Sequence, residues 1–123
     1  MRKTALIVDD STSMRQLVSF TLAQAGFDVI EGCDGRDALA KLKAAAGKVS
    51  IIITDVNMPV MDGIAFVREV RATADHKFTP ILMLTTESQD TKKKEGKAAG
   101  ATGWLVKPFN PEQMLQVVAK VLP

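Results

Sequence analysis

The chain has 123 residues, a length typical of one domain. Hydrophobic residues make up 46% of it and charged residues 24%, as in ordinary soluble globular domains. The 16 basic and 14 acidic residues are too balanced to indicate nucleic-acid binding, and the apolar runs are too short for a membrane-spanning helix, which needs ~20 residues. We therefore expect a cytoplasmic domain that binds neither nucleic acid nor membrane, and the single Cys33 fits a reducing compartment.

Short apolar runs alternate along the chain with segments whose apolar residues recur at helical spacing. The runs predict strands at residues 4–8, 27–31, 49–54, 80–85 and 101–106. The other segments predict helices from Ser11 or Ser13 to Ala25, at 36–46, after Asp62, at 87–99 and at 111–121. Strands that alternate with helices favour an α/β fold, and the fully apolar run at 49–54 predicts a strand covered on both faces.

Polar residues and glycines mark the expected helix ends. Ser11 or Ser13 can cap the first helix and Asp62 the third, because a short oxygen-bearing side chain accepts a free backbone N–H at a helix start. Asp34–Gly35 is expected to form a turn. The Lys-rich helix at 87–99 is expected to be weak and to be interrupted by Gly96.

Four of the apolar runs end on polar residues suited to one another, namely Asp9 with Asp10, Asp55, Thr85 and Lys107. If the runs are parallel strands of one sheet, these residues meet at the edge where ligands bind, outside the carboxyl ends of the strands. Crowded carboxylates repel each other, and Mg²⁺ would stabilise them because it prefers oxygen ligands. Each residue taken alone also has a structural explanation. The aspartates could cap helices or end a strand, Thr85 could be an ordinary strand residue, and Lys107 could be a surface lysine.

Such a group of residues can perform phosphoryl chemistry. A carboxylate can attack phosphorus to form an aspartyl-phosphate, and Asp55 is the best candidate because it follows a fully apolar strand and heads a loop with free backbone N–H groups. Phosphoryl transfer depends mainly on positioning and charge neutralisation. Lys107 could neutralise one phosphoryl oxygen, and the Thr85 hydroxyl could donate a hydrogen bond to another.

Four segments of the chain carry a family resemblance: Val8-Asp9-Asp10-Ser11, residues 54–63 (TDVNMPVMDG), Leu84-Thr85-Thr86-Glu87 and Val106-Lys107-Pro108-Phe109. Together they resemble the signature of response-regulator receiver domains, and most of all the single-domain chemotaxis regulators of the CheY type. The resemblance implies one receiver domain over residues 1–123 with no output domain. It also implies a flavodoxin-like (βα)5 three-layer sandwich, doubly wound, with parallel strand order 2-1-3-4-5, for which this family is itself a standard example.

The resemblance also implies residue roles at the site. Asp55 would accept the phosphoryl group from a histidine kinase, with Lys107, Thr85 and the Thr86 backbone contacting it. Asp10 and Asp55 would bind Mg²⁺, or Mn²⁺ in its place. The remaining implied metal contacts are the backbone carbonyl of Asn57 and, through water, Asp9. The Lys107–Pro108 bond would be cis.

Two further groups of residues are implied to control and transmit the signal. Thr85 and Trp104 would form the switch, although the family usually has tyrosine or phenylalanine in place of the tryptophan. Asn57 and Glu87 would border the hydrolytic water and allow self-hydrolysis. The output surface would combine helix 87–99, strand 101–106 and the last helix, through Lys92, Lys93, Lys94, Lys97, Trp104 and Val117. The lysines equally fit a solvated face, and the valine can simply pack on the sheet.

The implied partners are a histidine kinase of the chemotaxis type and, as candidates, a flagellar motor switch protein and a phosphatase, each bound by a monomer. Three alternatives stay open. One is a phosphate sink or relay that contacts no motor. Another is a Mg²⁺-dependent phosphohydrolase, which would need an acid–base carboxylate where Asn57 stands. The third is a flavin- or nucleotide-binding module, whose phosphate Asp9 and Asp10 would repel.

Overall fold

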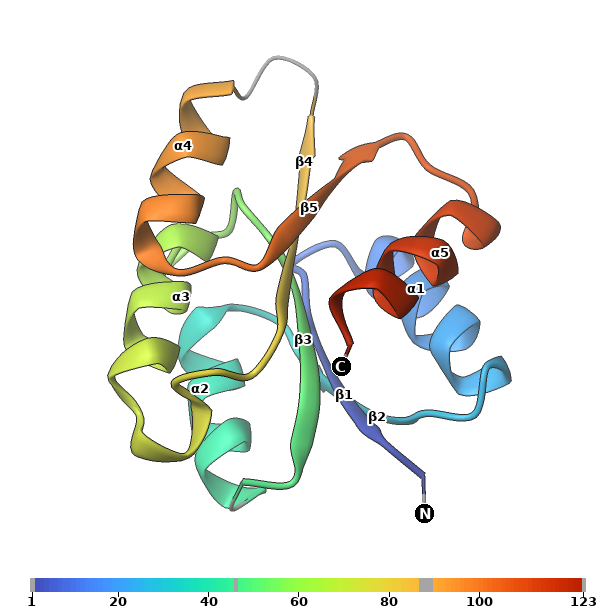
Figure 1. Cartoon of the computed structure of the whole chain (residues 1–123), viewed down its shortest axis with the longest axis horizontal. Coiled ribbons are helices and arrows are strands. Elements are labelled where there is room, and N and C mark those ends of the chain that lie inside the picture. The colour runs from blue at the N-terminus through green and yellow to red at the C-terminus, as the bar shows by residue number, and fades with distance from the viewer. Residues whose placement is uncertain (1, 46, 87–89, 123) are drawn as a thin grey trace.

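The computed structural model describes residues 2–45, 47–86 and 90–122 (Figure 1). In these residues one sheet of parallel strands has the order β2-β1-β3-β4-β5. The strands are β1 (Thr4–Val8), β2 (Asp28–Gly32), β3 (Val49–Asp55), β4 (Ile81–Thr86) and β5 (Gly103–Lys107). This arrangement confirms the predicted doubly wound, flavodoxin-like fold.

Helices cover both faces of the sheet. They are α1 (Thr12–Gln24), α2 (Gly35–Ala44), α3 (Gly63–Ala72), the short 3₁₀ helix η1 (Ala74–His76), α4 (Asp90–Ala99) and α5 (Pro111–Val121). Helices α1 and α5 lie on one face, and α2, α3 and α4 lie on the other (Figure 1). Across the described ranges, none of these helices combines the length and apolar character that a bilayer span requires.

Two apolar clusters fill the spaces between the sheet and its helices. Alternate residues of β1 point to opposite faces, so Leu6 packs on the side of α2 and α3 while Ile7 packs on the side of α1 and α5. The same alternation in β3 places Ile52 and Ile53 in different clusters, both fully buried. Full burial of such a side chain contributes about 1.5–3 kcal/mol, which explains why the central strands are continuously apolar.

Side-chain caps begin the helices as the sequence predicts, with one correction. Ser11 accepts the Met14 N–H at 3.3 Å, and Asp62 accepts the Ala65 N–H at 2.8 Å. The helix predicted from Arg36 begins one residue earlier, at Gly35, and Asp34 of the predicted turn caps it by accepting the Asp37 N–H at 2.8 Å. The predicted turn is thus the first turn of a helix.

The prediction that Gly96 interrupts the fourth helix is wrong. Helix α4 continues through Gly96, which is buried against β4. A Cβ at this position would lie 2.5 Å from the sulfur of Met83, so the missing side chain lets the helix approach the sheet. The predicted start of this helix at Glu87 falls outside the described residues.

Candidate functional site

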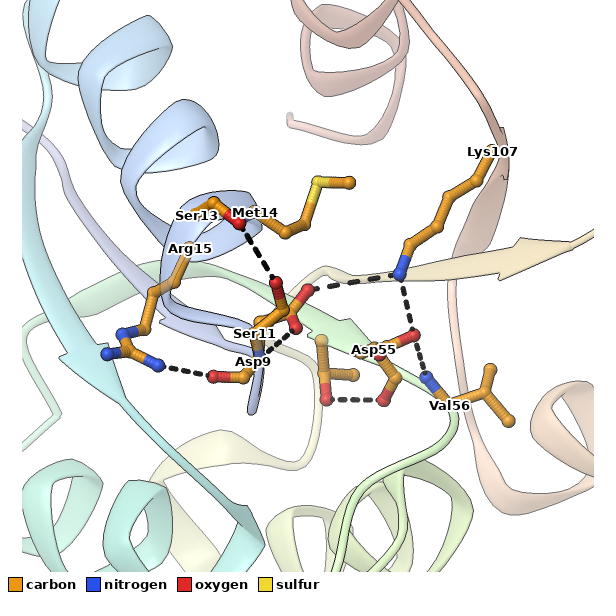
Figure 2. A network of polar contacts seen from close by, with 9 residues as sticks. Asp9, Ser11, Ser13, Met14, Arg15, Asp55, Val56 and Lys107 are labelled. Atoms are coloured by element: carbon orange, nitrogen blue, oxygen red, sulfur yellow. Dashed lines mark hydrogen bonds and ion pairs between the residues drawn. The ribbon is translucent and has the colours of Figure 1, made fainter.

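The carboxyl ends of the strands bring predicted site residues together, and Figure 2 shows three of them, Asp9, Asp55 and Lys107. Asp9 and Asp10 follow β1, Asp55 ends β3 and Lys107 ends β5. Thr85 is the second-to-last residue of β4, directly after Leu84, which pairs with Asp55. The predicted convergence at one sheet edge is therefore observed.

Three carboxylates form the acidic part of the site. One oxygen each from Asp9, Asp10 and Asp55 lies within 4.8 Å of the other two. Asp9 is fully buried and Asp10 is exposed. Burial raises the pKa of Asp9, the backbone N–H of Ser11 opposes this, and the negative charge of Asp55 raises the pKa further. Holding three negative charges this close together costs free energy, and a bound cation would lower that cost.

Lys107 is the cation that the chain itself supplies. Its Nζ donates a hydrogen bond to Asp55 Oδ1 at 3.1 Å and lies 3.9 Å from Asp9 Oδ2. Asp55 Oδ1 also accepts the Val56 N–H at 2.9 Å. In the described part of the chain no further hydrogen bond reaches the Asp55 carboxylate, which leaves Oδ2 as its open oxygen. The Lys107–Pro108 bond is cis, as the resemblance implies.

The backbone after β3 is tightly folded against the site. Gly63 N–H donates to the Val56 carbonyl at 2.8 Å. A Cβ on Gly63 would collide with the Asp55 carbonyl oxygen, so only glycine fits beneath the aspartate. Asn57, the predicted carbonyl ligand, lies exposed in the loop between β3 and α3.

The predicted switch residues lie on the face of the sheet covered by α4. Thr85 is 1% exposed, and its hydroxyl has no hydrogen-bond partner among the described residues. Trp104 is half-buried and packs against the cluster on the α2–α4 side, paired in register with Met83. Thr86 is exposed and pairs in register with Lys107, whereas Glu87 lies outside the described residues.

The predicted output surface is only partly exposed. Lys94 and Lys97 are exposed on α4. Lys92 lies 3.7 Å from Glu95, and Lys93 lies 3.8 Å from Asp90, so two lysines are paired within the helix.

Helix α5 packs its apolar side chains against the sheet and α1. Val117 is half-buried and packs with the cluster on the α1 and α5 side, as do Leu115, Val121 and Leu122. Val117 thus packs on the core with part of its side chain and leaves the rest accessible, so its place in the output surface stays a prediction.

Arg15 touches the site although the sequence analysis did not assign it there. Its Nη1 donates to the Asp9 carbonyl at 2.7 Å, and its Nε donates to Glu31 at 3.1 Å (Figure 2). One signal could have indicated it, because Arg15 is the only charged residue between Asp10 and Asp28.

Comparison with known proteins identifies the family. Residues 5–119 match the response regulator receiver domain. The chain belongs to this family. Chemotaxis protein CheY1 of Helicobacter pylori (strain ATCC 700392 / 26695) is 39% identical over 118 residues, which cover 95% of this chain and 94% of that protein. The solved structure of the chemotaxis response regulator CheY4 of Vibrio cholerae is 57% identical, covers 99% of this chain and 100% of that one, and superposes with a TM-score of 0.93.

The receiver fold is also shared with a longer regulator. The alkaline phosphatase synthesis transcriptional regulatory protein PhoP of Bacillus subtilis is 36% identical over 122 residues, 99% of this chain but 49% of that protein. The full-length matches to chemotaxis proteins distinguish this receiver, which is a response regulator of two-component signalling of the CheY type. A phosphohydrolase or a flavin module is not favoured.

Proposed function

We propose that this receiver accepts a phosphoryl group on Asp55 from a histidine kinase and then signals by binding another protein. The observation that carries the proposal is the contact of Lys107 with Asp55 at 3.1 Å, beside two further carboxylates at the same sheet edge. One oxygen of Asp55 is held by Lys107 and Val56, and the other accepts no hydrogen bond from the residues that the structure describes. The nucleophile, a counter-charge and a metal site thus lie within reach of one phosphoryl group.

The residues present fit a divalent cation. Asp9 Oδ2 is buried and accepts no hydrogen bond in the described residues, although buried oxygens normally accept one, and Lys107 Nζ lies 3.9 Å from it. Asp10 and Asp55 place further oxygens within 4.8 Å of it. A small set of oxygen ligands, most of them carboxylates, suits Mg²⁺ or Mn²⁺. We propose that Asp10, Asp55 and the Asn57 carbonyl hold the ion, with Asp9 acting through water.

In the proposed reaction, Asp55 Oδ2 forms a bond to phosphorus while the bond between phosphorus and the donor's imidazole nitrogen breaks. The electron pair of the broken bond remains on the imidazole. Lys107 stays beside the acceptor and neutralises charge on the transferring group, which is the main requirement of this chemistry. The bound divalent cation supplies further charge neutralisation. Hydrolysis of the product by water, bordered by Asn57 and Glu87, would return Asp55 to its free form.

The proposed output follows from the buried Thr85 hydroxyl, which would turn toward a phosphoryl oxygen. Its movement would free space beside β5 for Trp104 and so alter the surface formed by α4, β5 and α5. Exposed Lys94 and Lys97 suit an acidic partner surface. We propose a monomeric cytoplasmic regulator for which a flagellar motor switch protein and a phosphatase are candidate partners, and a phosphate sink is the alternative.

The test is to incubate the protein with acetyl phosphate and Mg²⁺ and to measure its mass. We expect one added phosphoryl group in the wild type and in Asp28→Asn, a control on the exposed start of β2, and none in Asp55→Asn. Equal modification of Asp55→Asn would refute the assignment. Binding of the beryllofluoride-activated protein to a flagellar switch peptide would then separate motor control from a phosphate sink.

A further inference from the structure

Arg15 joins three segments that surround the acidic cluster. It lies in the first turns of α1, its Nη1 donates to the Asp9 carbonyl after β1 at 2.7 Å, and its Nε donates to Glu31 of β2 at 3.1 Å. The side chain is 17% exposed, so the guanidinium is largely enclosed by these contacts. Figure 2 shows it on the far side of Asp9 from Lys107. The contact of Arg15 with Asp9 is made to the backbone carbonyl of that residue and not to its carboxylate.

The Asp9 carbonyl is important because few other contacts fix the position of Asp10. Asp10 is exposed, and its carboxylate makes no hydrogen bond or ion pair with any residue in 2–45, 47–86 or 90–122. The carbonyl that Arg15 binds belongs to the Asp9–Asp10 peptide unit, which is planar. Fixing that oxygen therefore fixes the plane from which the Asp10 side chain departs.

Two other contacts hold this turn. The Asp9 N–H donates to the Gly32 carbonyl at 3.1 Å, and Asp9 Oδ1 accepts the Ser11 N–H at 2.9 Å. The first contact holds the peptide before Asp9, and the second spans Asp10, but neither of them binds the oxygen of the Asp9–Asp10 peptide. Within the described chain, Arg15 is the only side chain that binds this carbonyl.

We propose that Arg15 is a positioning residue that orients Asp10 for the divalent cation, and that Glu31 keeps the guanidinium in place. This inference rests on the proposed metal site. A guanidinium near a cation would by charge alone weaken cation binding, but pairing with Glu31 offsets that repulsion. The two roles differ in sign, since loss of positioning weakens Mg²⁺ binding whereas loss of a repelling charge strengthens it.

Lysine provides the discriminating substitution. Arg15→Lys keeps the charge but loses the planar fork that lets one side chain bind Asp9 and Glu31 in two directions. We expect calorimetric titration to show Mg²⁺ binding weakened roughly 10-fold or more, as for other residues that orient metal ligands. The matched control is Arg36→Lys, an exposed position on α2 with no partner in the described residues, and we expect its affinity to equal that of the wild type.

A second variant keeps the test independent of folding defects in the first. Glu31→Ala leaves Arg15 unchanged but removes its anchor, and we expect weaker Mg²⁺ binding with a thermal unfolding midpoint still above the titration temperature. The double variant should bind no more weakly than Arg15→Lys alone, because both changes disable one unit. Wild-type affinity in both folded single variants would overturn the role of Arg15. Failure of the wild type itself to bind Mg²⁺ would instead overturn the proposed metal site, and with it this inference.

Discussion

Gly63 offers the sharpest test of how the fold holds Asp55, the proposed phosphoryl acceptor. It is the first residue of α3 and lies directly beneath the end of β3. A Cβ added there would collide with the Asp55 carbonyl oxygen and lie 2.9 Å from the Val56 Cα. The obstructing atoms are backbone, so they cannot swing aside as the end of a long side chain could. Gly63→Ala must therefore displace either α3 or the segment that carries Asp55.

The expected cost follows from these contacts. Overpacking of this kind costs about 1–3 kcal/mol, and loss of the hydrogen bond from Gly63 N–H to Val56 adds about 1 kcal/mol. The higher helix propensity of alanine offsets at most about 1 kcal/mol. The net loss is about 2 kcal/mol, which lowers the unfolding midpoint by roughly 8 °C for a domain of this size.

Two measurements test this reasoning, namely thermal unfolding and the rate of modification by acetyl phosphate. Gly103→Ala is the control, because a Cβ there would lie 3.5 Å from Val121, an ordinary contact. We expect that control to match the wild type or to be slightly more stable. Gly63→Ala should be both less stable and slower to become phosphorylated. A Gly63→Ala protein with wild-type stability and rate would show that the turn beneath Asp55 is pliable and would refute the argument.

Three other predictions concern buried or charged groups. Thr85→Val removes a buried, unpartnered hydroxyl, so urea unfolding should show about 1–2 kcal/mol of added stability, while the fluorescence response of Trp104 to beryllofluoride should disappear. Burial lowers the pKa of His76, so the unfolded chain binds a proton at its ordinary value near 6.5 before the folded protein does. Stability should thus fall as pH drops below about 6.5, and His76→Gln should flatten that slope in urea unfolding at successive pH values, whereas equal slopes would contradict it. Lys107→Met should slow phosphorylation by acetyl phosphate roughly 100-fold, and Lys120→Met, on the exposed side of α5, should not.

Much of the fold could be predicted because its signals are local. The run 49–54 is apolar on both faces, and it became the central strand β3, buried on both sides. Caps such as Ser11 and Asp62 act within one helical turn, so the sequence reveals them directly. Gly96 was misjudged because its role is tertiary, since the absence of a Cβ matters only when Met83 lies opposite.

The same distinction applies to the site. Asp9, Asp10, Asp55 and Lys107 could be assembled from sequence because parallel strands all end at one edge. Arg15 could not, because its partner is a backbone carbonyl, and a sequence does not show which carbonyls are left free. The sequence left two interpretations of Val117 open, because helical spacing alone does not show how much of a wide apolar stripe the sheet and α1 will cover, and its half-buried side chain is compatible with both.

The unpartnered Thr85 hydroxyl suggests how large the proposed switch can be. In the unmodified protein Lys107 already has Asp55 as a partner, so a phosphoryl group would replace one charged contact of that lysine with another. The threonine gains more, because its buried hydroxyl passes from no partner in the described residues to a charged acceptor. Such a hydrogen bond contributes about 1.5–3 kcal/mol, which corresponds to a shift of roughly 10- to 150-fold between two conformations. A shift of this size suffices for a signal when the active conformation is a minor population before phosphorylation.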